Sequence, residues 1–355
     1  MSRRYKPTGT NSFFAEGFRL EKLSKQGDPL ERLNKIVDWE FFRATVEKSL
    51  SSERMVDAGP KPYDPLLMFK ILILQRYYNL SDEQLEYQIL DRLSFCRFLE
   101  LSLNDRVPDE KTIWVFREKL INKGLDKELF DLFGGLLEEH GLIAHQGKII
   151  DASFVEAPRQ RNSKEKNDQI KEGQSPESWD EIPNKKRQKD IDARWTKKNN
   201  ETHYGYKNHA KVDNKHKFIE TYTTTSASVH DSQALDDLLT EKDEGQHLYA
   251  DSAYTGEEQE KTIKKYKVKN KVHEKGYKNK PLTEEQKLLN KEKSKIRARV
   301  EHVFGFMEQS MNKLYVRSIG KKRASGYVSL VNLTYNLFRY EQVVRLDRIS
   351  VSNWE

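Results

Sequence analysis

The stretch Gly147-Lys-Ile-Ile-Asp-Ala-Ser-Phe-Val155 marks the point at which the hydrophobic pattern of this chain changes. Upstream, apolar residues recur at helical spacing. Lys148 to Val155 instead alternates and contains β-branched and aromatic side chains, which predicts a strand. Asp151 shares one face of this strand with Ile149 and Ser153. A carboxylate in such apolar surroundings is costly unless it has a partner or a metal.

Residues 31–145, before this strand, predict an all-α domain. Asp64-Pro65 is an N-cap followed by proline, Ser81-Asp-Glu-Gln84 has the pattern of a capping box, and Pro108-Asp109 opens another helix. A last helix is predicted from Asp126 to His140. Residues 1–30 are polar and predict a tail.

The basic side chains around these helices allow two interpretations, and the sequence leaves both open. The helices could form a helix-turn-helix that reads DNA, or a plain bundle used for dimerisation. The side chains in question are Arg76, Arg92, Arg97, Arg106, Lys111 and Arg117.

Residues 146–345 predict a mixed sheet with helices, so the fold class is α/β. Further strands are predicted at 204–212, 218–226, 247–250 and 268–273, and helices at 232–240, 255–266, 291–312 and 324–345. Residues 160–200 contain few apolar side chains and predict a mobile polar insertion. Residues 346–355 predict a C-terminal tail.

Two more acids stand beside apolar patterns. Asp251 ends the stretch Gln246-His-Leu-Tyr-Ala-Asp251, where a strand should give way to a loop, and Glu301 lies beside the helical stripe that begins at Val300. Taken singly, each acid has a structural alternative. Asp151 could be a hydrogen-bonded core acid, Asp251 a helix cap, and Glu301 a surface partner of Arg297.

Taken together, the three acids favour a divalent-metal site. Carboxylate oxygens suit Mg²⁺, and two such ions about 4 Å apart can activate a nucleophile and stabilise the leaving oxygen of a phosphodiester. Asp151, Asp251 and Glu301 are therefore the predicted catalytic residues and metal ligands.

The charge distribution favours a polyanionic partner. Residues 261–300 contain 15 Lys/Arg and 4 Asp/Glu, a net of +11, whereas the whole chain has +7, so the remainder has 7 − 11 = −4. Such a tract, placed just before Glu301, indicates nucleic acid. The alternative is a solvated lysine-rich surface that aids solubility.

Composition narrows the setting of the protein. The single cysteine, Cys96, excludes an intrachain disulfide and a thiolate metal cluster, and favours a reducing cytoplasm. The N-terminus lacks an apolar core, so no secretory signal is expected. The most apolar run, Leu66 to Leu74, is too short to span a membrane.

Several motifs resemble the DDE transposases of bacterial insertion sequences, in particular the insertion-sequence-five family, over most of the chain. Ile150-Asp-Ala-Ser153, Ala250-Asp-Ser-Ala-Tyr254 and Arg297-Ala-Arg-Val-Glu-His-Val-Phe-Gly305 resemble its three acidic motifs. Pro62-Tyr-Asp-Pro-Leu-Leu67 and Pro108-Asp-Glu-Lys-Thr-Ile113 resemble its N-terminal domain.

This resemblance implies a ribonuclease-H-like catalytic fold and two Mg²⁺ ions, for which Mn²⁺ can substitute. It also implies hydrolysis at the terminal inverted repeats followed by joining of the 3′-hydroxyl ends to target DNA. The expected setting is a bacterial cytoplasm with the protein on the nucleoid, as a homodimer on double-stranded DNA. Asp151, Asp251 and Glu301 match the family triad.

The family's Tyr-Arg-Glu-Lys signature is half present. Arg297 matches its arginine, but Ser294 and Glu308 stand at the tyrosine and lysine positions. Lys295 or Lys313 could substitute for the missing base. The predicted DNA contacts are Arg297, Arg299, Lys295, His302 and Lys313.

Four neighbours of these motifs have two interpretations each. His302 could contact DNA or be a partly buried structural residue. Asp231 could begin a helix or support catalysis. Tyr254 and Tyr204 could stack on a base or pack in the core.

Two other functions stay open at this point. The chain could be a ribonuclease-H-like nuclease without strand transfer, or a non-enzymatic DNA-binding protein derived from a transposase.

Overall fold

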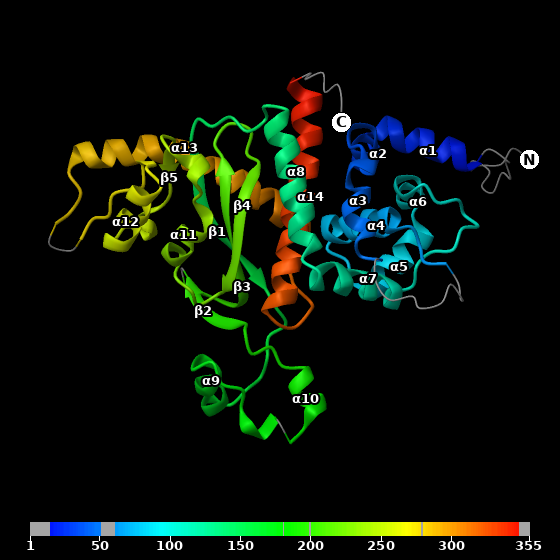
Figure 1. Ribbon diagram of the computed structural model, residues 1–355, viewed down its shortest axis with the longest axis horizontal. Coiled ribbons are helices and arrows are strands. Elements are labelled where there is room, and N and C mark those ends of the chain that lie inside the picture. Colours follow the sequence, from blue (N-terminus) through cyan, green and yellow to red (C-terminus); the bar gives the residue numbers. More distant parts are fainter. Residues whose placement is uncertain (1–14, 51–60, 180, 199, 278–279, 348–355) are drawn as a thin grey trace, which may run out of the picture.

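The computed structural model describes residues 15–50, 61–179, 181–198, 200–277 and 280–347. A helical part extends to Glu139, and a mixed sheet flanked by helices begins at Lys148. The two parts lie on opposite sides of the last helix, α14, in Figure 1. The predicted α/β class with a helical N-terminal part is confirmed.

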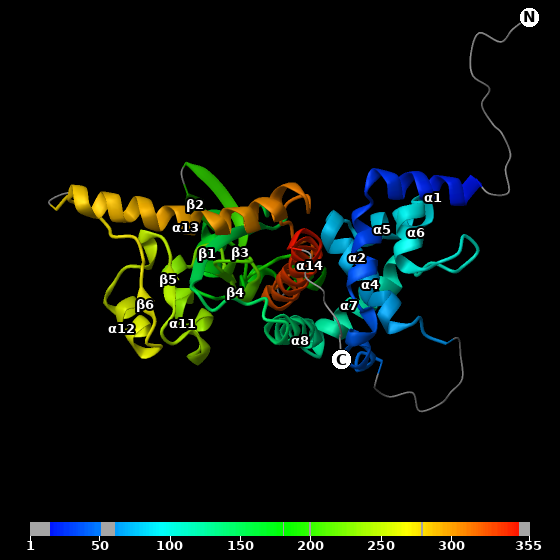
Figure 2. The same ribbon diagram turned by 90° about the horizontal axis from the view of Figure 1, so that it is seen from above.

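The helical part is a sequence of short amphipathic helices joined by tight connections, in the order α1 Ala15–Gln26, α2 Pro29–Ile36, η1 Trp39–Phe42, α3 Arg43–Glu47, α4 Pro65–Tyr78, α5 Asp82–Asp91, α6 Leu93–Leu99, α7 Glu110–Asn122 and α8 Leu125–Glu139. Figure 2 shows α4 running through the middle of this group. Its interior position agrees with its sequence, because α4 is apolar on nearly every face and is buried along most of its length.

The capping signals begin helices where the sequence predicted. The Asp64 carboxylate accepts a hydrogen bond from the Leu66 amide at 2.8 Å, and Ser81 and Gln84 form the reciprocal capping box of α5. Asp109 accepts from the Thr112 amide at 2.7 Å. These side chains satisfy amides that have no partner inside the helix, which fixes each starting residue.

The prediction of a polar tail over residues 1–30 is wrong for its second half. Residues 15–26 form α1, and Asp28 caps α2 by accepting from the Leu30 amide at 2.9 Å. The Arg97 guanidinium donates to Asp28 at 2.6 Å and ties this segment to α6. Such a long-range ion pair has no local sequence signal. Residues 1–14 lie outside the described part of the chain.

The sheet is built around β1 Lys148–Glu156, as its apolar pattern predicted. β1 pairs antiparallel with β3 Glu201–Asp213 and parallel with β5 His247–Tyr249. β3 also pairs with β4 Ile219–Ser226 and with β2 Arg194–Lys198, and β5 pairs with β6 Lys269–Asn270. Strands 204–212, 218–226 and 247–250 are thus confirmed nearly to the residue, whereas the strand predicted at 268–273 is shorter.

Alternation along β1 sends its side chains into two different cores. Ile149 and Val155 belong to the larger apolar cluster with α13 Glu284–Gln309 and α14 Lys321–Asp347. Ile150 belongs to a smaller cluster with α11 Leu235–Leu238 and α12 Glu257–Lys265. Asp151 therefore faces α13, which Figure 2 shows running along one side of the sheet.

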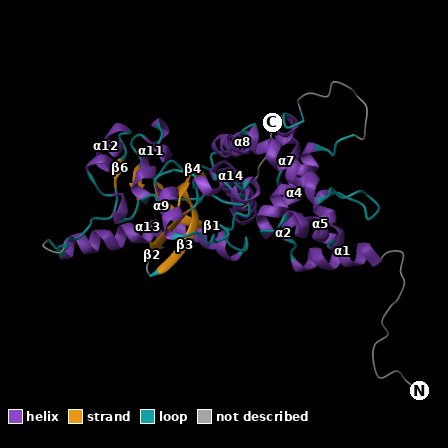
Figure 3. Ribbon diagram, turned by 90° about the horizontal axis from the view of Figure 1, so that it is seen from below, coloured by secondary structure: helices purple, strands orange, loops and turns teal. Residues whose placement is uncertain are grey.

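Short 3-10 turns complete the part that contains the sheet, namely η3 Asp231–Ala234, η4 Glu241–Asp243 and η5 Ser252–Tyr254. The helices predicted at 232–240 and 255–266 are present in shorter form, and those at 291–312 and 324–345 begin earlier than predicted. Figure 3 shows the sheet between α11 and α12 on one side and α14 on the other. Residues 348–355, at the end of the predicted C-terminal tail, lie outside the described part.

The polar segment 160–200 contains regular structure that its composition did not predict, namely α9 Lys164–Lys171, η2 Glu177–Trp179, α10 Pro183–Arg187 and strand β2. The buried carboxylate of Asp190 organises it by accepting from the Tyr206 hydroxyl at 2.8 Å and from the Gly320 amide at 3.1 Å. Trp179 is fully buried. A few anchoring contacts replace the apolar stripe that a sequence pattern would detect.

Helix α14 joins the two parts of the molecule, because it packs against α4 and α8 on one side and β4 on the other. Its Asn332 amide exchanges hydrogen bonds with Asn208 of β3, and Asn336 bonds the backbone of Ile219 on both sides. Each of these buried amides donates and accepts across the interface, so they fix the position of α14 on the sheet.

The close approach of α14 and α7 supplies a stability test. A Cβ built on Gly326 would lie 2.5 Å from Cγ1 of Ile121, whereas one built on Gly135 of α8 meets nothing within 4 Å. We expect Gly326→Ala to destabilise the protein by about 1–3 kcal/mol through overpacking. The matched variant Gly135→Ala should stabilise it by about 0.5–1 kcal/mol. Urea denaturation measures both; equal effects would contradict the packing described.

Candidate active site

Asp151 lies in the middle of β1, largely buried, with two polar partners. One oxygen accepts from the Ala152 amide at 2.9 Å, and the other accepts from the Arg297 guanidinium of α13 at 2.9 Å. Burial raises the pKa of Asp151 above its usual range, the Ala152 hydrogen bond and the Arg297 charge oppose that rise, and Asp251 adds to it. Asp151 is therefore a hydrogen-bonded core acid and also a neighbour of two predicted site residues.

Asp251 lies beside Asp151 because their strands are parallel and in register. β1 and β5 pair through Lys148 with Leu248 and Ile149 with Tyr249, and each acid follows two residues later. Ligands commonly bind at this carboxyl edge of parallel strands. The Asp251 carboxylate also caps η5 by accepting from the Ala253 amide at 2.8 Å, so its capping role and its position near Asp151 coexist.

Glu301 reaches the same region from α13 but remains largely in solvent. Val300, Val303 and Met307 form the buried stripe that fixes this helix over β1. The Glu301 side chain is 64% exposed, and its carboxylate lies 3.6 Å from the Arg297 guanidinium. The predicted i,i+4 contact between the two is therefore present, and Arg297 contacts both Asp151 and Glu301.

The structure brings Asp151 and Asp251 together and links Glu301 to them through Arg297. Within the described residues, no three His, Cys, Asp or Glu side chains lie close enough together to hold a metal ion. Asp151 and Glu301 do not come together directly, because the Arg297 guanidinium contacts both of them. A metal site made by all three acids stays a prediction.

The Tyr254 hydroxyl is a buried polar atom without a hydrogen-bond partner among the described residues. The side chain is 1% exposed and packs with the smaller core, so stacking on a base is wrong for this residue, and the core interpretation holds. Burial, then the charges of Asp151, Asp231 and Asp251, raise its pKa well above its ordinary value. An unpaired hydroxyl beside these acids is an oxygen donor that a bound cation or water could use.

Tyr204 is likewise in the core rather than available for stacking. It is 5% exposed, and its ring lies 4.8 Å from that of Trp195.

Two lysines that the sequence did not single out contact Asp231. Lys207 of β3 is buried and donates to Asp231 at 2.7 Å, and Lys198 of β2 lies 3.9 Å from the same acid. The Lys198 charge also acts on Asp151. Asp231 is the first residue of the short helix η3, so the interpretation of Asp231 as a helix-start acid is confirmed. Lys198 belongs to the polar segment without periodicity, which explains why no pattern indicated it.

Ser294, at the signature's tyrosine position, has ordinary hydrogen-bond partners. The Ser294 hydroxyl donates to the Asn290 carbonyl at 2.8 Å and lies 3.3 Å from Nε2 of His273. Burial lowers the pKa of His273, the nearby Arg297 and Lys293 charges add to this, and Asp251 opposes it. His273 thus lies close to Asp251 and next to Ser294, which stands at the signature's tyrosine position. The sequence motifs did not indicate His273, because it lies in a different segment of the chain.

The predicted DNA contacts other than Arg297 lie on the surface. Lys295, Arg299, His302 and Lys313 are all exposed, so the partly buried interpretation of His302 is wrong. On α13, Lys295, Arg299 and His302 are four and three residues apart and share a face. The Arg299 guanidinium donates to the Asn214 carbonyl at 2.6 Å, which holds it near the end of β3.

The residues present suit a divalent cation. Asp151 and Asp251 supply carboxylate oxygens, and the Tyr254 hydroxyl has no partner among the described residues. The repulsion that Asp251 exerts on Asp151 would be relieved by a positive ion. Hard oxygen donors of this kind are those that Mg²⁺ prefers.

Comparison with known proteins agrees with this geometry. The family described as "Transposase DDE domain" matches residues 144–337, just over half of the chain, and "Transposase domain (DUF772)" matches residues 18–119. The chain belongs to the DDE-domain transposases. Its sheet is accordingly the ribonuclease-H-like catalytic fold of that family, as predicted.

Among solved structures, the cryo-EM structure of the piggyBac transposase synaptic complex with hairpin DNA is similar to this chain. The TM-score is 0.43 at 12% identity, with 92% of this chain and 77% of that chain covered. Across the described residues, no helix is long and apolar enough to cross a membrane.

The unpaired hydroxyl beside the acids supplies a test of the site. Tyr254→Phe removes no hydrogen bond of the described structure, so we expect stability to change by less than about 1 kcal/mol. If the hydroxyl serves the acids, Mg²⁺-dependent activity should fall about 10-fold or more, as for other outer partners of metal ligands. Thermal unfolding and DNA cleavage assays measure the two effects. Unchanged cleavage would show that Tyr254 only packs.

Proposed function

We propose that this protein is an insertion-sequence transposase that binds the terminal inverted repeats of its element. It cleaves DNA there by metal-dependent phosphodiester hydrolysis and joins the 3′-hydroxyl ends to target DNA. The observation that supports this best is that Asp151 in β1 and Asp251 just after β5 both follow the parallel pairing of these strands by two residues, with Arg297 and Glu301 facing them from α13.

The chemistry needs cations at that edge, because a phosphodiester is anionic and resists attack by another anion. Asp151, Asp251 and Glu301 would hold two Mg²⁺ ions, or Mn²⁺ in their place, and the ions would activate water and stabilise the leaving oxygen. The chain itself keeps Asp151 oriented through the Ala152 amide and holds Arg297 among the acids. Glu301 is exposed on the side from which DNA would approach.

The exposed face of α13 supports the proposed DNA contacts. Lys295, Arg299 and His302 share that face, Arg297 lies beside the acids, and Lys313 follows the end of the helix. Cationic side chains in such a row would contact successive phosphates and position the scissile strand. Membership of the insertion-sequence-five family, with Ser294 and Glu308 at two signature positions, remains part of this proposal.

The three acids supply the main test of the proposed chemistry. We expect Asp151→Asn, Asp251→Asn and Glu301→Gln each to reduce cleavage of the element's ends by at least about 100-fold, because each removes an anionic ligand. Binding of the same DNA should change little. Glu292→Gln, an exposed acid on the same helix, is the matched control and should cut normally. Cleavage at a normal rate by a triad variant would remove that residue from the site.

A second measurement separates the proposed transposase from the alternatives. Precleaved ends supplied with a target plasmid should give joined products. Cleavage without joining would indicate a nuclease, whereas sequence-specific binding without Mg²⁺-dependent cleavage would indicate a non-enzymatic DNA-binding protein. Because the proposed reaction acts on two DNA ends, we expect a homodimer on DNA. Light scattering with and without DNA would measure the mass of the complex.

The basic tract generates a prediction about salt. Lys264, Lys291 and Lys295 are exposed, and neutralising all three to Gln should weaken DNA binding. The slope of log affinity against log salt should flatten by roughly 0.9 for each lysine that contacts a phosphate. Anisotropy titrations over a salt series measure this.

The control for the salt experiment removes the same charge from the helical part through Lys22→Gln, Lys61→Gln and Lys119→Gln, all at exposed positions. This control should flatten the slope less. An equal effect of the two triple variants would contradict a specific role of the tract.

A further inference from the structure

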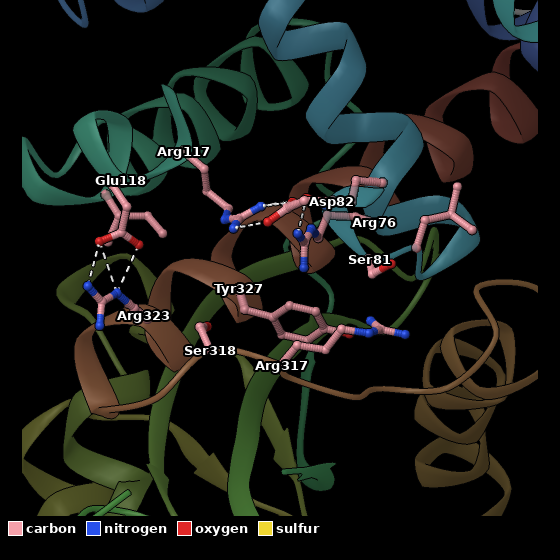
Figure 4. Close-up of a pocket in the computed structure, with 12 residues that line it drawn as sticks. Arg76, Ser81, Asp82, Arg117, Glu118, Arg317, Ser318, Arg323 and Tyr327 are labelled. Atoms are coloured by element: carbon pink, nitrogen blue, oxygen red, sulfur yellow. Dashed lines mark hydrogen bonds and ion pairs between the residues drawn. The ribbon is translucent and has the colours of Figure 1, made fainter. Parts of the chain in front are cut away.

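A small cavity of about 50 Å³ lies where the helical part meets the part that contains the sheet. Residues of α4, α5 and α7 line it together with the segment before α14 and the first two turns of that helix (Figure 4). Its charged lining consists of Arg76, Arg117, Arg317, Arg323, Asp82 and Glu118. Four cations thus face two anions.

Both carboxylates in this lining already have a partner. Asp82 accepts two hydrogen bonds from Arg117, at 2.5 and 2.8 Å, and Glu118 accepts from Arg323 at 2.9 Å (Figure 4). Within each of these two bidentate pairs, the arginine charge and the carboxylate charge cancel. The charges of Arg76 and Arg317 therefore remain in excess.

Arg76 is the unusual member of the group, because it is 7% exposed and its Nε has no hydrogen-bond partner among the described residues. Its guanidinium donates to the side-chain oxygen of Gln75 and lies 4.7 Å from the Tyr327 ring centroid, and both partners are neutral. Burial, then Arg117, lower the pKa of Arg76 to about 10, so it stays charged at neutral pH. The nearest carboxylate that acts on Arg76 is that of Asp82, which is already paired with Arg117, so the buried charge of Arg76 is only partly compensated, which is costly.

Arg317 adds a second uncompensated charge at the mouth of the cavity. Its guanidinium is exposed and is held by neutral acceptors of Asn79, the side-chain oxygen at 2.8 Å and the carbonyl at 2.9 Å. These contacts orient the guanidinium without neutralising it. The cavity has room for about four water-sized groups, on the order of a phosphate group.

We infer that this cavity binds a phosphate group, with Arg76 and Arg317 as its principal donors and the paired Arg117 and Arg323 beside them. The phosphate could belong to the DNA backbone or to a free phosphate ion. The first source rests on the proposed function, whereas binding of the anion itself does not. A backbone phosphate held here would place DNA against the junction of the two parts as well as against α13.

The test uses the full-length protein in a buffer that contains chloride as its only inorganic anion. Inorganic phosphate is titrated by calorimetry and by thermal unfolding, with sodium chloride at equal ionic strength as reference. We expect phosphate to bind the wild type and to raise its melting temperature above the chloride reference. Arg317→Gln, at an exposed position that should not affect folding, should weaken phosphate binding at least 5-fold. Arg106→Gln, exposed in a loop of the helical part, should have no effect.

A second arm measures binding of a DNA duplex over a salt series. If the phosphate belongs to DNA, Arg317→Gln should reduce the salt slope by roughly one unit, and Arg106→Gln should not. A changed affinity for phosphate with an unchanged DNA slope would support the site and assign it to a free anion. A changed DNA slope alone would support it as a backbone contact.

The inference is overturned if Arg317→Gln changes neither phosphate affinity nor the DNA salt slope. Arg76→Gln adds a second measurement where that variant folds, with a larger loss of phosphate affinity expected. Absence of Mg²⁺-dependent cleavage by the wild type would overturn the proposed function without affecting phosphate binding in this cavity. Failure of the proposed function and failure of the phosphate site are therefore distinguishable.

Discussion

The contact between Arg297 and Asp151 is the interaction on which the candidate site depends. It joins a strand to a helix 146 residues away through a 2.9 Å ion pair. The guanidinium offsets part of the cost of a carboxylate inside the sheet and sets which turn of α13 lies over β1. Glu301, one turn later, then faces the same edge. Because Arg297 lies between the acids, a positive charge already occupies the centre of the arrangement, where the proposed chemistry requires cations.

A second constraint is the shared core of the two parts. The change of periodicity near residue 146 separates two types of secondary structure, yet one apolar cluster extends from Leu30 of α2 to Val343 of α14 and includes Ile149 of the sheet. Helix α14 makes this possible because it is buried on both sides. The cavity with Arg76 lies at the same junction. A ligand there would therefore contact both parts at once.

Features that depend on neighbouring residues were predictable from the sequence. The caps at Asp64, Ser81 and Asp109 bind amides two or three residues away, and β1 alternates over its own length. Features that depend on distant partners were not. Residues 160–200 are anchored by Asp190, whose partners Tyr206 and Gly320 lie 16 and 130 residues further along the chain. Composition therefore indicated an unstructured segment where the structure has helices and a strand.

The sequence alone determined most of the long strands and helices, the capped starts at Asp64, Ser81 and Asp109, and the three acids, because hydrophobic period and capping are local properties. The tertiary structure decided how the acids meet. Parallel pairing of β1 and β5 placed Asp251 beside Asp151, and the packing of α13 brought Arg297 between Asp151 and Glu301. It also decided that Tyr254 is buried and that Arg76 is buried with its Nε unpaired among the described residues. These outcomes depend on which side chains share a space, which residue spacing does not specify.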